Sequence, residues 1–243
     1  MKAKIDLHTH TISSGHAYST LIENAKEASK KGIEVLGVTD HGPCMPGGPH
    51  LYHFGNKRAV PSIIEGVTIL FGAEANILDY DGNLDMPDFY LKKLDIILAS
   101  LHEPVIKPGT MEENTNAILK VMDNPYVDIL AHLGNPVFEL DYEKIIKKAK
   151  EKSIFIEINN SSNRSRKGSF DNCVKIAQLC KELKVPVVLG TDSHIAYQIG
   201  EFTEALKVTE AANLSEDLII NYDKALILNY LKKKGKIKDI NLD

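Results

Sequence analysis

Residues 4–10 read KIDLHTH, a short apolar run that ends in His8 and His10. Apolar runs of this length are typical of buried β-strands, and runs that end in polar side chains recur along the chain. These runs are 35–39 before His41, 68–73 before Glu74, 96–101 before His102, 128–131 before His132, 154–158 before Asn159 and Asn160, and 187–191 before Asp192 and His194. The pattern predicts seven strands, each ending in a polar group.

Helical patterns separate most of these runs. After the first run, Ser19 and Thr20 offer a possible helix cap and Gly32 suits a helix end. Further helical patterns lie at about 111–123, 141–152, 170–184, 201–212 and 222–234. Strands that alternate with helices form parallel βαβ units, so the predicted fold class is α/β, a distorted seven-stranded (β/α)7 TIM-like barrel. The segment 42–56 is rich in Pro and Gly and is predicted to be a loop over the pocket.

The polar groups at the strand ends predict a metal site. In a barrel of parallel strands, the carboxyl ends of all strands emerge on one face, so residues far apart in the sequence meet there. Imidazole and carboxylate groups are ligands of zinc, manganese and iron ions. One histidine at a strand end would be an ordinary structural or surface residue, but repetition on successive strands favours a metal centre on this face.

Length and composition fit one enzyme domain. The chain has 243 residues, of which 43% are hydrophobic, and this predicts a single domain over residues 1–243. The first strand begins by about residue 4, which leaves no room for a secretory signal, and no apolar run is long enough to span a bilayer. Cys44, Cys173 and Cys180 lack a disulfide or zinc spacing, so we expect reduced thiols and a cytoplasmic location.

The charge pattern gives little sign of a macromolecular partner. A net charge of -4 and a pI near 6.1 predict no extended nucleic-acid surface, and no membrane partner is expected. The one strongly basic stretch, residues 231–238, follows a predicted helix and is interpreted as a solvated tail. The composition leaves a homo-oligomer open.

An ordered set of motifs carries a family resemblance. The motifs are DLHTH (6–10), TDHG (39–42), EAN (74–76), HEP (102–104), His132 with GNP (134–136), EINNSS (157–162) and TDSH (191–194). Together they resemble the polymerase-and-histidinol-phosphatase (PHP) family, and within it the YcdX-type phosphatase branch. The resemblance extends from residue 4 to about residue 235 and implies a distorted seven-stranded barrel that hydrolyses phosphate esters.

The resemblance also implies three divalent metal ions, commonly zinc, with manganese or iron as alternatives. One ion would take His8, His10, Glu74 and Asp192; Glu74 would bridge to a second held by His102 and His132; the third would take His16, His41 and His194. A metal-bridging hydroxide would attack the phosphorus atom of a small phosphorylated substrate. Glu74, Asp192 and His194 are the residues expected to support catalysis.

Several further residues are candidates for substrate binding or support. The basic loop after the 154–158 run holds Arg166 and Lys167, whose cationic groups suit phosphate, although it could equally be a solvated loop. Substrate contacts are also predicted for Asn159 and His53. Strand alternation places Asp6 on the face of His8 and His10, and Glu157 on that of Asn159, where either carboxylate could orient a metal ligand or simply bond to backbone. Metal-bound water, His53 and Asp40 are each candidates for the general acid that protonates the leaving group.

Three functions from different classes are consistent with these residues. The leading hypothesis is a phosphatase that acts on phosphate monoesters of small cytosolic metabolites. A phosphodiesterase or exonuclease that acts on short nucleic acids could use the same metals, and a groove of Lys and Arg beside the pocket would favour it. A non-catalytic regulatory domain stabilised by metal would be favoured by an incomplete ligand set, whereas the predicted set is complete.

Overall fold

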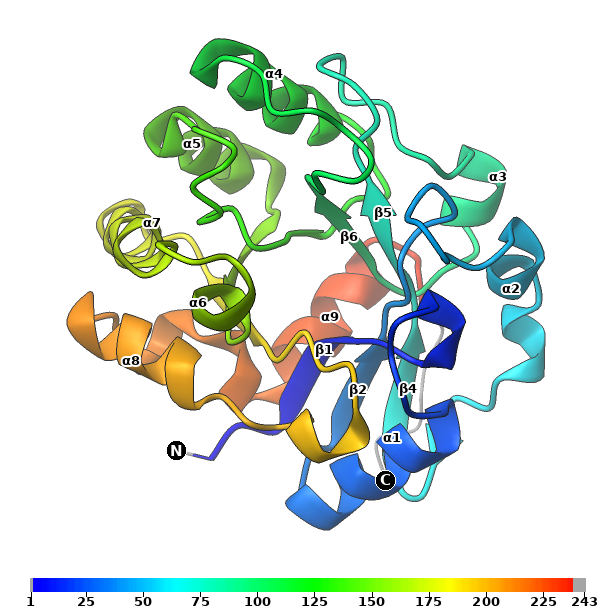
Figure 1. The fold of residues 1–243 in the computed structure, drawn as a ribbon. Helices are drawn as coiled ribbons and strands as arrows, with labels where there is room; N and C mark the ends of the chain where they lie inside the picture. Colours follow the sequence, from blue (N-terminus) through cyan, green and yellow to red (C-terminus); the bar gives the residue numbers. More distant parts are fainter. Residues whose placement is uncertain (1, 238–243) are drawn as a thin grey trace.

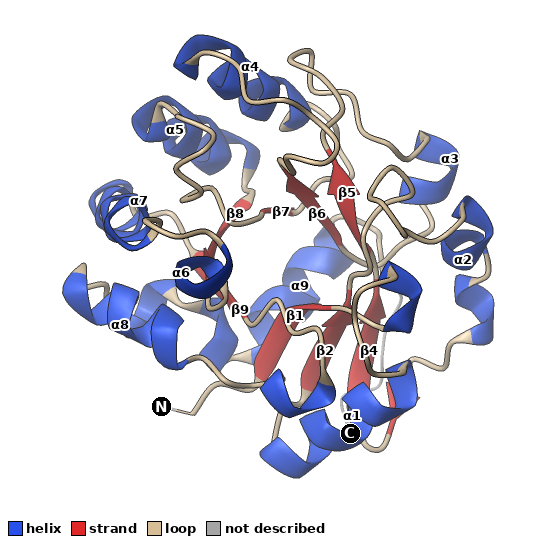
Figure 2. Ribbon diagram, in the orientation of Figure 1, coloured by secondary structure: helices blue, strands red, loops and turns tan. Residues whose placement is uncertain are grey.

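The computed structural model describes residues 2–237 and has an α/β fold with two sheets. The first sheet has the order β1 (Ile5–Thr9), β2 (Val35–Val38), β4 (Val67–Phe71), β3 (Ile63–Ile64). The second has the order β5 (Ala73–Asn76), β6 (Ile97–Ser100), β7 (Ile129–Leu130), β8 (Phe155–Asn159), β9 (Val187–Gly190). Neighbouring strands are parallel except for the antiparallel pair of β3 and β4. Figure 2 shows the strands around a common centre with the helices outside.

Gly72 marks the point where the chain passes from one sheet to the other. The N–H of Gly72 donates to Val38 O at 2.9 Å, whereas the N–H of Ala73 donates to Ile96 O at 3.2 Å. A Cβ on Gly72 would lie 2.1 Å from the Ile96 carbonyl oxygen, so the close approach requires glycine. The predicted strand 68–73 is therefore two strands, and the described residues form two sheets in place of the predicted single barrel of seven strands.

Side chains join the two sheets where β1 lies beside β9. Asn221 Nδ2 donates to Ile5 O and to Leu189 O, both at 2.8 Å, and Leu189 N donates to Asn221 Oδ1 at 2.7 Å. Thr191 Oγ1 donates to Asp6 Oδ2 at 2.6 Å, and burial raises the pKa of Asp6 to about 6. These side-chain contacts add to the backbone hydrogen bonds at this seam, where Asp192 N donates to His8 O at 2.8 Å and His10 N donates to Ser193 O at 2.9 Å.

The helices lie outside the strands (Figure 1). They are α1 (Leu21–Lys31), α2 (Leu51–Gly55), α3 (Asp88–Leu91), α4 (Met111–Val121), α5 (Tyr142–Lys152), α6 (Ser162–Ser165), α7 (Phe170–Leu183), α8 (Thr203–Ala211) and α9 (Lys224–Lys233). The prediction that all of 42–56 is loop was wrong at α2, because the His50 side chain caps this short helix by accepting from Tyr52 N. Within residues 2–237, no helix has the length and apolar character needed to cross a membrane.

Two apolar cores support the strands. The larger core packs α1, α4, α5, α7 and α8 against the sheets. The second joins one set of strand residues to α9, through side chains that include Ile5, Leu7, Ile227 and Leu231. α9 covers this second core at one end of the strands. The side chains predicted as metal ligands lie at the other end.

The basic C-terminal stretch is not the solvated tail that its composition predicts. Lys234 Nζ donates to Asp128 Oδ1 at 2.7 Å, and Lys236 pairs with Asp128 Oδ2. The side chains of Asp128 and Lys236 are 0% and 5% exposed, and Tyr230 OH lies 3.2 Å from Asp128 Oδ1. A buried carboxylate requires such partners. Lys238 lies outside the described residues.

Candidate metal centre

The residues predicted as metal ligands meet at the carboxyl ends of the strands. They are His8 and His10 from β1 and just after it, His16 from the following loop, His41 after β2, Glu74 in β5, His102 after β6, His132 after β7, and Asp192 and His194 after β9. All are buried except His16, which is exposed, and His194, which is half-buried. His132 and Asp192 adopt left-handed backbone, with φ of 34° and 54°, a conformation that costs free energy and clusters at functional sites.

Glu74 lies at the middle of this group, and its two oxygens face different histidines. Oε1 lies 2.7 Å from His132 Nε2 and 3.3 Å from His102 Nε2. Oε2 lies 2.8 Å from His41 Nδ1 and 3.3 Å from His8 Nε2. A carboxylate surrounded in this way can bridge two cations, one on each oxygen.

The side chains present fit metal ions. His41 Nδ1, Glu74 Oε2 and His102 Nε2 are buried atoms. Although His41 Nδ1 and Glu74 Oε2 lie 2.8 Å apart, none of the three atoms forms a hydrogen bond of acceptable geometry among the described residues. Unpaired buried polar atoms are costly, yet the same three residues form a group whose ligand atoms could share one ion. His8, His10 and Glu74 form a second such group, and His10, His41 and His194 a third.

His16, His132 and Asp192 adjoin these groups without being part of them. The His16 ring centroid lies 5.0 Å from that of His41 and 4.8 Å from that of His194. Asp192 Oδ1 lies 3.2 Å from His10 Nε2. The structure therefore gathers all the predicted ligands, but it places His10 and His41 each in two groups, whereas the resemblance assigns each of them to a single ion.

Glu157 orients His8 and the backbone of His132. Its Oε1 lies 2.6 Å from His8 Nδ1, and its Oε2 accepts from His132 N at 2.9 Å. Burial opposes a charge on His8, but the carboxylates of Glu157, Glu74 and Asp192 together raise its pKa well above the usual range. A metal ion at His8 must therefore displace a proton.

Asp6 does not share the face of His8 and His10, contrary to the prediction from strand alternation. The register of β1 against β2 shifts between Asp6 and Thr9, which breaks the alternation of side chains. As a result Asp6 accepts from Gly200 N at 3.1 Å, in addition to its contact with Thr191. It closes the seam between β1 and β9, and among the described residues its carboxylate forms no hydrogen bond to the side chain of a predicted ligand.

Asn76 and Asp85 together position His102, and only Asn76 lies near a predicted strand end. His102 Nδ1 donates to Asn76 Oδ1 at 2.7 Å, while Asn76 Nδ2 donates to Asp85 Oδ2 at 2.5 Å. This leaves His102 Nε2 directed at Glu74, and burial lowers the pKa of His102 to about 4. Asn76 is two residues beyond Glu74 on β5, but Asp85 lies in a loop where no pattern indicates it.

Asp40 supports the site and is disfavoured as the general acid. Ser14 Oγ donates to Asp40 Oδ1 at 2.7 Å and lies 3.1 Å from His10 Nδ1. Burial favours the neutral acid, but the contact with His53, the charge of His10 and several hydrogen-bond donors outweigh it and lower the pKa of Asp40 to about 2. An ionised carboxylate has no proton to give a leaving group at neutral pH.

A pocket of about 860 Å³ opens onto the ligands. Its lining includes His16, His41, His102, Asp192 and His194, together with Arg164 and Arg166. Both terminal nitrogens of Arg166 lie 3.3 Å from Asp192 Oδ2. The guanidinium group is thus held beside the ligands and directed into the pocket.

The other predicted substrate contacts lie elsewhere. Lys167 is exposed and stands outside the pocket lining. Asn159 is buried and donates to Glu157 Oε2 and Asp192 Oδ2. His53 lies 3.2 Å from Asp40 and lines a separate hollow. The loop beyond β8 therefore brings Arg166 to the pocket, whereas the side chain of Lys167 is exposed and does not line it.

Comparison with known proteins agrees with this geometry. The PHP domain family matches residues 6–161, which is well over half of the chain. The chain therefore belongs to the PHP domain family. A protein of Clostridium botulinum (strain Langeland) named "Probable phosphatase" is 56% identical over 243 residues, which are 100% of both chains. The predictions of the family and of a phosphatase are confirmed.

Solved structures show a similar fold. Histidinol phosphate phosphatase from Lactococcus lactis, complexed with zinc, L-histidinol and phosphate, has a TM-score of 0.64 at 19% identity, covering 88% of this chain and 95% of that chain. A chain of archaeal ribonuclease P with mature tRNA has a TM-score of 0.52 at 15% identity, covering 98% and 96%. At such low identity the likeness is one of fold alone.

Proposed function

We propose that this chain hydrolyses phosphate monoesters of small cytosolic metabolites at a centre of three divalent ions, with zinc as the expected metal. The observation that carries the proposal is Glu74, whose Oε1 faces His102 and His132 and whose Oε2 faces His8 and His41. The zinc and phosphate in the Lactococcus lactis structure support the same reading. We also propose that residues 1–243 act as one domain, since the ligands come from both sheets.

We propose the ligand sets that the family resemblance implies, and the closeness of the donor atoms supports them. The proposed sets are His8, His10, Glu74 and Asp192 for one ion, Glu74, His102 and His132 for a second, and His16, His41 and His194 for a third. Bound divalent ions would supply positive charge for a phosphate dianion and activate water near neutral pH. The two carboxylates leave this charge in excess, so the pocket favours anions.

The protein's own groups position the substrate. Arg166 presents two donors at the ligands, and Asp192 holds them in place through Oδ2. A guanidinium group in this position can bind two phosphate oxygens at once. His194 Nδ1 donates to Asp192 O at 3.0 Å, which fixes the ring and leaves Nε2 free for the pocket. Substrate binding thus depends on Asp192, which positions both Arg166 and His194.

Elemental analysis joined to a phosphate-release screen tests the proposal. Purified protein should hold about three divalent ions per chain, because nine predicted ligand side chains with Glu74 as a bridge suit three sites that keep open positions for water and substrate. It should release phosphate from monoesters such as sugar phosphates, nucleotides or histidinol phosphate, and chelation should abolish release. A fully active preparation with one ion per chain would refute the trinuclear centre, and activity confined to phosphodiesters would refute the substrate class.

A further inference from the structure

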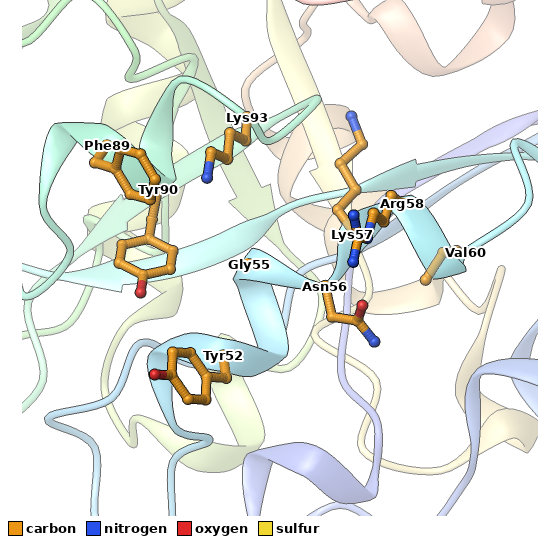
Figure 3. A pocket seen from close by; sticks show the side chains of 9 residues that line it. All are labelled: Tyr52, Gly55, Asn56, Lys57, Arg58, Val60, Phe89, Tyr90 and Lys93. Carbon is orange, nitrogen blue, oxygen red and sulfur yellow. The ribbon is translucent and has the colours of Figure 1, made fainter.

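A second hollow lies between α2 and α3 and shares no lining residue with the metal pocket. This α2–α3 groove has a volume of about 900 Å³, within the range of small-molecule sites. It is lined by Tyr52, Gly55, Asn56, Lys57, Arg58, Val60, Phe89, Tyr90 and Lys93. Figure 3 shows the three aromatic side chains gathered on one side and Arg58 on the other.

Two cations of the groove have no carboxylate partner within residues 2–237. Lys57 is paired with Asp95, but neither Arg58 nor Lys93 forms an ion pair among the described residues. Lys93 Nζ instead lies 3.5 Å from the centroid of the Phe89 ring. In a chain of net charge -4, two unpaired cations in one hollow provide a local site for an anion.

Aromatic surface adjoins these cations. The side chains of Tyr52 and Phe89 are 75% and 56% exposed, although both are large. The Tyr90 ring packs on the backbone of Gly55, where an added Cβ would lie 3.1 Å from Tyr90 Cε1. This contact ties α3 to α2 and holds the Tyr90 ring, while the exposed rings of Tyr52 and Phe89 can offer flat faces to a ligand.

We propose that the α2–α3 groove binds a nucleoside phosphate, with the base on the Tyr52 side and the phosphate at Arg58 and Lys93. Stacking on aromatic rings beside cationic groups is the means by which proteins hold nucleotides without reading their sequence. An inorganic anion would leave the rings exposed, and an acidic peptide would use the charges without the rings. A free nucleotide and a nucleotide within a single strand share the required chemistry.

Binding to the metal-loaded protein tests this site with two diesters, which a phosphomonoesterase does not hydrolyse. The probes are the methyl diester of thymidine 5′-phosphate and a labelled thymidine decanucleotide without a terminal phosphate. Arg58→Ala, Lys93→Ala and Tyr52→Ala should each weaken binding about tenfold, and Tyr52→Phe should retain it. Lys30→Ala, on the exposed side of α1, removes the same charge elsewhere and should change binding less than about twofold.

The outcomes separate the sources and the alternatives. Binding of both probes indicates a free nucleotide ligand, and binding of the decanucleotide alone indicates a single strand; either outcome supports the site when the three alanine variants weaken it. Hydrolysis of a small phosphomonoester should be unchanged in all variants, which also shows that they fold. The proposal fails if neither probe binds, if the variants bind like the wild type, or if dimethyl phosphate or an acidic peptide binds as tightly as the nucleotide.

Discussion

Glu157→Gln should weaken metal binding and turnover, because no orientation of the new amide satisfies the groups around it. Glu157 Oε1 lies 2.6 Å from His8 Nδ1, and Oε2 accepts from His132 N at 2.9 Å and Asn159 Nδ2 at 3.1 Å. A glutamine keeps one acceptor oxygen and must turn its NH₂ group toward a donor on the other side. Either His8 or His132 then loses its partner.

The expected size of the effect follows from these contacts. A hydrogen bond to a charged group is worth about 1.5–3 kcal/mol, and loss of the group that orients a metal-bound histidine lowers metal affinity about 10- to 100-fold. We expect losses of this size for metal affinity, and a decrease of about 1.5–3 kcal/mol in the free energy of unfolding of the metal-free protein.

Chelator competition with a zinc indicator measures the affinity, and phosphate release measures turnover. Glu151→Gln, at an exposed position of α5, is the matched control and should behave like the wild type. If folded Glu157→Gln protein bound zinc and turned over substrate as well as the wild type, the orienting role of Glu157 would be refuted.

Three further predictions concern other groups of the site. Glu74→Gln should lower metal content and activity more than any other single substitution, because it removes charge from two ions; wild-type metal content by elemental analysis would contradict the bridge. Arg166→Ala should reduce kcat/KM about 10- to 150-fold, chiefly through KM, whereas Lys167→Ala should remain near wild type in the same assay; equal effects would place the phosphate contact elsewhere. The metal-free protein should lose stability as the pH falls from about 6.5 toward 4, because burial lowers the pKa of His10 to about 3 and that of His102 to about 4, so the unfolded chain takes up protons at both histidines, whereas the folded chain gains only one at Asp6, whose pKa is raised to about 6; if these histidines titrate normally, denaturant titrations would show no loss of stability across this range.

The sequence predicted well which polar side chains come together, because the ends of parallel strands all point the same way. In parallel strands, side chains such as His8, Glu74 and Asp192 must emerge on the same side, whatever their separation in sequence. Their type and position were therefore enough to expect that they meet. The same reasoning placed Glu157 correctly, since β8 keeps regular alternation.

Other features depend on contacts that no periodic pattern records. The register shift in β1 turned Asp6 away from the ligands, and the close contact at Gly72 split one expected strand into two. Asp85 supports His102 from a loop through an intervening side chain. Lys236 lies in a basic stretch that looks solvated, but its partner is far away in sequence. Each of these depends on tertiary structure.

The pairing of Lys234 and Lys236 with Asp128 makes one strand of the candidate site depend on a distant segment of the chain. Asp128 lies just before β7, whereas Lys234 and Lys236 follow it by 106 and 108 residues. Without these lysines the buried carboxylate would lack a cation. The strand that leads to His132 is therefore stabilised by a segment that follows every predicted metal ligand in the sequence and contributes no ligand itself.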